Sequence, residues 1–118
     1  DIMIEDEWIE DPRSLMEILE VEEELVQKIW YTRHQYRAHL IRKGDIKLIP
    51  REKYSIETSH KTIVNDIWTG ALKAAKKVEK KYGIENLGHW TDFECGMLNG
   101  KLSALRWVTG EEWDNLDT

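Results

Sequence analysis

Apolar residues recur at steps of three and four along most of this chain, which is the spacing that places side chains on one face of an α-helix. The pattern is sustained in three segments, near 13–43, 59–82 and 92–108. No two segments show the two-residue alternation that is typical of paired strands. The sequence therefore predicts an all-α fold with three principal helices.

Helix-end signals support these segments. Ser14 followed by Glu17, and Thr91 followed by Glu94, fit the capping box in which each side chain bonds a backbone N–H of the first turn. Gly44 is the expected end of the first helix. That helix would then be about 45 Å long, at about 1.5 Å per residue, which is long for a chain of this size.

The middle of the chain is harder to assign. Thr58 or Ser59 can cap the second helix, and Gly83 ends it. Residues 44–58 are predicted to form an extended connection. Its stretch IKLI at 46–49 resembles a short strand, but no partner strand is evident from the sequence.

The third helix carries Gly96 and Gly100 in its interior, where each glycine costs about 1 kcal/mol relative to alanine. Apolar or small residues cover almost all of its circumference, which favours a buried, central helix. We expect the two glycines to form a groove that receives a neighbouring helix. A ligand in that groove is the alternative.

The composition fits one domain over residues 1–118, with an N-terminal arm at 1–10 and a C-terminal tail at 111–118. Within these 118 residues, Cys95 has no second cysteine with which to form a disulfide, and it is expected to be a buried thiol. No apolar run reaches membrane-spanning length, and no signal-peptide pattern opens the chain. These features favour a cytoplasmic protein with no membrane association.

Charge is arranged in blocks under a net charge of −6. Residues 1–27 hold eleven acids and one base, residues 28–43 hold five bases and no acid, and residues 84–118 hold seven acids and two bases. The acidic total argues against a nucleic-acid partner, and the blocks favour charge pairing within or between chains.

Signatures of catalysis are mostly missing from the sequence. There is no phosphate-binding glycine loop and no cysteine pair for zinc, so we expect neither a cofactor nor a metal. Glu20, Glu23 and Glu24 have the helical spacing of the magnesium ligands in all-α nucleotide pyrophosphatases, but the second helix offers Asp66 alone as a counterpart. A solvated acidic face at a helix N-terminus explains this run better.

Two groups of polar residues are candidates for ligand binding. Arg33 and Arg37 lie one helical turn apart with His34 beside them, and like charges at that spacing repel unless an anion lies between them. Two solvated arginines are the alternative. Asn99 and Arg106 lie on the third helix, where they either bond a connecting segment or bind a ligand.

The first helix is also the candidate for self-association. Three helices of this size leave part of its apolar stripe uncovered, and such patches typically mark interfaces. An antiparallel homodimer would set its acidic half against its basic half. The expected interface residues are Leu25, Ile29, Trp30, Tyr36 and Leu40.

Residues 71–118, with the helix GMLNGKLSALRW before an acidic tail that contains tryptophan, resemble a group of small uncharacterised bacterial proteins. The resemblance implies a bacterial or phage origin and a free-standing protein, and it implies no activity. Three classes of function therefore stay open. In order of preference they are an oligomerising protein-interaction module, a binder of a small anion or nucleotide, and a magnesium-dependent nucleotide hydrolase.

Overall fold

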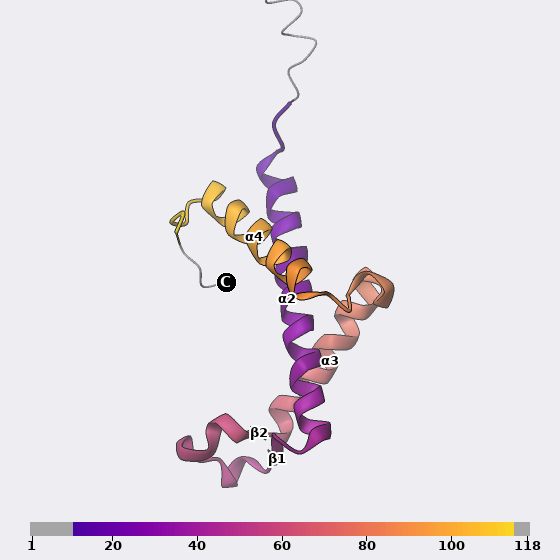
Figure 1. Cartoon of the computed structure of the whole chain (residues 1–118), viewed down its shortest axis with the longest axis vertical. Coiled ribbons are helices and arrows are strands. Elements are labelled where there is room, and N and C mark those ends of the chain that lie inside the picture. The colour runs from indigo at the N-terminus through magenta and orange to yellow at the C-terminus, as the bar shows by residue number, and fades with distance from the viewer. Residues whose placement is uncertain (1–10, 115–118) are drawn as a thin grey trace, which may run out of the picture.

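The fold is built along one long helix (Figure 1). In the computed structural model, which describes residues 11–114, α2 spans Leu15–Lys43 and is 29 residues long. Helix α3 (Asn65–Tyr82) lies along its C-terminal half and α4 (Asp92–Val108) along its N-terminal half. The predicted all-α class, with a long first helix, is confirmed. The predicted N-terminal arm lies outside the described residues.

Both predicted capping boxes form. The backbone N–H of Glu17 donates to the Ser14 hydroxyl at 3.1 Å, and the Glu17 carboxylate accepts from the Ser14 N–H at 3.2 Å. The bonds that the Glu17 carboxylate accepts from the Ser14 N–H and from the Ser14 hydroxyl lower the pKa of Glu17. Thr91 and Glu94 make the equivalent pair of bonds at the start of α4. Gly44, at φ 91°, ends α2 as predicted.

The second helix begins later than the sequence indicated. It starts at Asn65, because residues 62–64 form a strand, β2 (Thr62–Val64), which pairs in parallel with β1 (Lys47–Ile49). Short 3₁₀ helices at Arg51–Lys53 and Ile56–Lys61 connect the two strands. Three consecutive β-branched residues at 62–64 favour extended backbone, and the register pairs them with Lys47, Leu48 and Ile49.

Two separate clusters of side chains form the core. One joins α2 to α4, and its members are Leu25, Ile29 and Leu102, with Val26, Leu98 and Leu105 packed against them. The other joins α2 to α3 and to the segment after α3, and its members are Tyr31, Ala75, Val78 and Leu87, with Trp30 and Tyr82 packed against them. Helix α2 therefore contributes to both clusters and holds the molecule together.

The expectation of a buried, central third helix was wrong. Among the residues of α4, Leu102 alone is buried, at 1% exposed. A Cβ added at Gly96 or at Gly100 would have no heavy atom of the described residues within 4 Å, so no other helix within residues 11–114 fills the expected groove. The reason is that α3 and α4 lie on different halves of α2. The radius of gyration is accordingly 19.4 Å, against about 13 Å for a compact domain of this length.

The predicted C-terminal tail lies partly within the described residues. Trp113 packs edge-on against Trp107 of α4, with ring centroids 5.2 Å apart. This contact holds the start of the tail against the end of α4. Residues 115–118 lie outside the described part of the chain.

Candidate functional site

His34, a predicted ligand residue, belongs to the core instead. Its ring is stacked between two indoles, with centroids 5.1 Å from Trp30 and 4.8 Å from Trp68, and 7% of the residue is exposed. The stack joins α2 to α3. His34 is therefore a packing residue between the helices and cannot take part in an anion site on the surface of α2.

The surroundings of His34 favour a neutral imidazole. Burial lowers the pKa of His34, because the charged form loses its hydration. The positive charge of Arg37 lowers this pKa further, and the carboxylate of Glu79 on α3 opposes the shift. The net direction is downward, so His34 takes up a proton less readily than an exposed histidine does.

The other predicted ligand residues do not gather in a hollow of the surface. Arg33 and Arg37 are exposed on α2, Asn99 donates at 2.9 Å to the Cys95 carbonyl of its own helix, and Arg106 is half-buried. None of these residues lines the cavity between α2 and residues 84–90, and none lines the shallow groove at Gly96 and Gly100 of α4. Cys95, expected to be buried, is half-buried.

The predicted interface residues also fall into different surroundings. Helix α4 covers Leu25 and Ile29, which are 6% and 7% exposed, so the premise that a single chain leaves them uncovered was wrong. Trp30 and Leu40 are half-buried. Tyr36, at 64% exposed, remains at the surface. An interface centred on these positions would require α4 to leave α2.

The acidic turn of α2 is engaged in local contacts. Glu23 accepts from Gln27 at 2.7 Å, and Glu24 pairs with Lys28 at 3.0 Å. Asp66, their only expected counterpart, bonds Arg51 beside the strands, at the opposite end of α2 (Figure 1). Within residues 11–114, no cluster of three or more histidine, cysteine or acidic side chains is placed to hold a metal ion.

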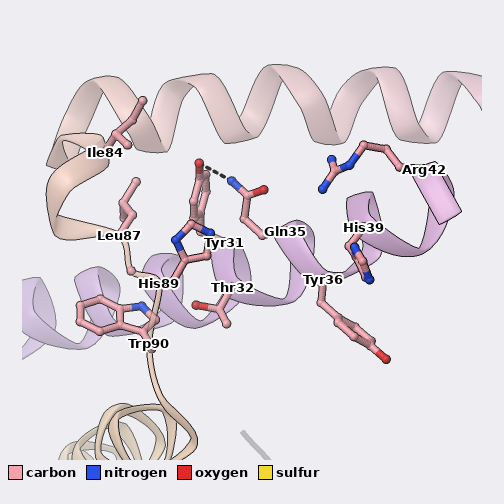
Figure 2. Close-up of a pocket in the computed structure, with 11 residues that line it drawn as sticks. Tyr31, Thr32, Gln35, Tyr36, His39, Arg42, Ile84, Leu87, His89 and Trp90 are labelled. Atoms are coloured by element: carbon pink, nitrogen blue, oxygen red, sulfur yellow. Dashed lines mark hydrogen bonds between the residues drawn. The ribbon is translucent and has the colours of Figure 1, made fainter.

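A cavity of about 390 Å³ lies between α2 and the segment that follows α3. Helix α2 supplies one wall, with Tyr31, Thr32, Gln35, Tyr36, His39 and Arg42. The opposite wall, shown with the first in Figure 2, consists of Ile84, Leu87, Gly88, His89 and Trp90. Neither wall contains an acidic residue.

A hydrogen-bonded chain fixes the wall that α2 supplies. The Tyr31 hydroxyl donates to the carboxylate of Glu79 on α3 at 2.6 Å, and it accepts from the Gln35 amide at 2.6 Å (dashed in Figure 2). Burial raises the pKa of Tyr31, and the hydrogen bond to Glu79 raises it further. The tyrosine is therefore held as a neutral hydroxyl, and Gln35 is oriented by it.

Polar groups at the two ends of this cavity lack partners. Neither His39 nor Arg42 has a hydrogen bond or an ion pair with any described residue, and Arg42 points back toward Gln35 (Figure 2). At the other end, Nε1 of Trp90 is buried with no acceptor among residues 11–114. A buried N–H without an acceptor loses its hydration with nothing in exchange.

The second candidate surface is the side of α4 that faces away from α2. It is lined by Phe93, Gly96, Met97, Gly100, Lys101 and Ala104, and we call it the α4 open face. Phe93 is 77% exposed and Met97 is 46% exposed. Trp107, one turn beyond Ala104, is 52% exposed. The surface is almost entirely apolar, with a shallow groove over the glycines.

The sequence analysis did not predict the cavity, although the residues of its α2 wall follow a helical spacing. Tyr31, Gln35, His39 and Arg42 follow one another at steps of four, four and three, so they share one face of a helix. This row of hydrogen-bonding side chains along one face of α2 could have been recognised. The opposite wall at 84–90 could not, because its position depends on where α3 ends and packs.

Comparison with family models, with curated proteins and with solved structures finds no match to this chain. Among the described helices, none combines the length and the apolar character that crossing a membrane requires. Function is therefore argued from the two surfaces alone.

Proposed function

We propose that this chain is a protein-interaction module that self-associates as a homodimer through the α4 open face. One observation carries the proposal: α4 is apolar on two sides, and residues 11–114 cover one of them. Leu98, Leu102 and Leu105 pack against α2. Phe93 and Met97 belong to the other side, and they remain in contact with solvent.

The exposed side chains make an uncovered face costly. Burying a side chain such as Phe93 or Met97 is worth about 1.5–3 kcal/mol, and monomeric proteins rarely expose a contiguous apolar patch of this kind. The N-terminal half of α2, beside α4, adds Leu15 at 63% and Met16 at 67% exposed. These exposed residues add to the apolar surface that a second copy could cover.

Gly96 and Gly100 also favour a second copy of α4 as the partner of this face. In an isolated chain, Gly96 and Gly100 lower helix propensity by about 2 kcal/mol in total. No heavy atom of the described residues lies within 4 Å of a Cβ built at either position, so no contact offsets this cost. Against a second helix, the lack of Cβ atoms allows the backbones to approach closely and to pack at interior density. An α4 face that meets the same face of another copy is self-complementary about a twofold axis.

Light scattering after size-exclusion chromatography tests this proposal. The wild-type chain should elute with twice its mass of 14.0 kDa. Met97→Lys places a charge in the centre of the face and should give the monomer mass. Ile56→Lys is the matched control, because Ile56 is 81% exposed on a 3₁₀ helix outside the face. A monomer mass for the wild type would refute the proposal, and so would equal effects of the two substitutions.

A further inference from the structure

We propose that the cavity between α2 and residues 84–90 binds a small organic anion with a flat apolar body, such as an aromatic phosphate or carboxylate. This goes beyond self-association, because the cavity shares no residue with the α4 open face. Its volume of about 390 Å³ falls within the range of about 300–1,000 Å³ that is usual for small-molecule sites.

The apolar part of the ligand is set by one end of the cavity. Leu87 is 5% exposed and belongs to the core, and the ring of Trp90 lines the same end of the cavity (Figure 2). Tyr31 contributes an aromatic ring from α2, and its hydroxyl is already engaged with Glu79 and Gln35. These rigid, flat surfaces suit an aromatic or similarly planar group.

The charge of the ligand is set by the other end. Arg42 carries a permanent positive charge and a planar set of donors that matches a carboxylate or a phosphate with two parallel bonds. His39, three residues earlier and thus on the same helical face, adds a ring N–H. No acidic side chain lines the cavity to compete for these donors. A cation would meet no counter-charge here, so an anion is favoured.

Trp90 supplies an independent reason for a ligand. Its indole N–H is buried with no acceptor within residues 11–114, and the residue belongs to the lining of the cavity. An indole nitrogen donates and cannot accept, so a polar oxygen on the bound molecule would satisfy it. A ligand with an acceptor near its flat body and an anionic group beyond it would engage Trp90 and Arg42 together.

The test uses three probes that separate the two parts of the ligand. 1-Naphthyl phosphate has the flat body and the charge, 1-naphthol has the flat body, and inorganic phosphate has the charge. Each is titrated into ¹⁵N-labelled protein while the six tryptophan indole N–H signals are followed, with the Trp90 signal assigned from Trp90→Phe. We expect a saturable shift of the Trp90 signal with naphthyl phosphate, at a concentration about tenfold lower than with either fragment.

Matched variants identify the anion contact. Arg42→Gln should weaken binding of naphthyl phosphate by about tenfold or more, since it removes a charge-assisted pair. Arg37→Gln is the control, because Arg37 is an exposed arginine of the same helix outside the cavity, and it should bind as the wild type does. No saturable shift at Trp90 with naphthyl phosphate would overturn the proposal. Equal binding by Arg42→Gln and wild type would also overturn it.

Discussion

The imidazole of His34 on α2 lies nearly parallel to the indole of Trp68 on α3, with ring centroids 4.8 Å apart and planes inclined by 20°. Trp30 stacks on the other side of the same ring at 5.1 Å. The docking of α3 on α2 is thereby centred on a titratable group. Protonation would place a positive charge in the core near Arg37, with Glu79 as the partial counter-charge.

The fold should lose stability in mild acid through His34. Its pKa in the folded chain lies below the ordinary value of 6.5, so the unfolded chain binds more protons in the window just below pH 6.5. His34 therefore costs the fold nothing above pH 6.5. Below that pH the free energy of unfolding decreases as pH falls, by at most about 1.4 kcal/mol per pH unit. Urea unfolding at pH 7.5 and 5.5 measures the decrease.

His34→Phe provides the comparison, since it keeps an aromatic ring in the stack and removes the titration. The wild type and His34→Phe share all carboxylates that titrate in the same pH range, so the effect of these carboxylates cancels when the two proteins are compared. We expect the wild type to lose more stability than His34→Phe between the two pH values. Equal losses would show that His34 is not held neutral by the fold.

The hydroxyl of Tyr31 should contribute measurably to stability. Tyr31→Phe removes the donor that Glu79 accepts at 2.6 Å and leaves a half-buried carboxylate without it. A loss of about 1–3 kcal/mol in the free energy of unfolding is expected. Tyr36→Phe is the control, because Tyr36 is 64% exposed on the same helix and should change stability little. Similar results for both variants would contradict a structural role for the Tyr31–Glu79 bond.

The cap of α4 should be worth about 1 kcal/mol. Thr91→Ala removes the hydroxyl that accepts the Glu94 N–H at 3.1 Å. Thr69→Ala removes a hydroxyl that bonds the Asn65 carbonyl within α3 at 3.0 Å, which adds nothing to a helix interior, and it should be neutral or slightly stabilising. Urea unfolding at one fixed protein concentration compares them. The prediction would be contradicted if Thr69→Ala lost stability and Thr91→Ala did not.

Local signals in the sequence predicted the helices better than their packing. The capping boxes at Ser14 and Thr91 and the glycine stop at Gly44 were sufficient to place the ends of α2 and the start of α4, because these bonds lie within one turn of the chain. The start of α3 was misplaced, because residues 59–61 belong to a 3₁₀ helix and residues 62–64 pair with β1, a contact between segments fifteen residues apart in register.

The candidate surfaces depended on packing that the sequence does not reveal. The two-sided apolar character of α4 was evident from Gly96, Gly100 and the leucines, but the inference that one chain covers both sides was wrong, since α3 lies on the other half of α2. His34 was predicted to be a ligand residue because it lies beside Arg33 and Arg37 in the sequence. Its burial comes from Trp68, which reaches it only through the crossing of α3 over α2.

Sedimentation equilibrium of the wild type beside Gly100→Leu tests the central claim, that the α4 open face joins two copies. In a single chain the added side chain meets nothing within 4 Å of its Cβ, and leucine favours the helix over glycine by about 0.8 kcal/mol. The account predicts a dimer mass for the wild type at micromolar concentration, and a monomer mass for Gly100→Leu with its helical content and melting temperature retained. A wild-type monomer across the concentration range, or an equally dimeric Gly100→Leu, would contradict it.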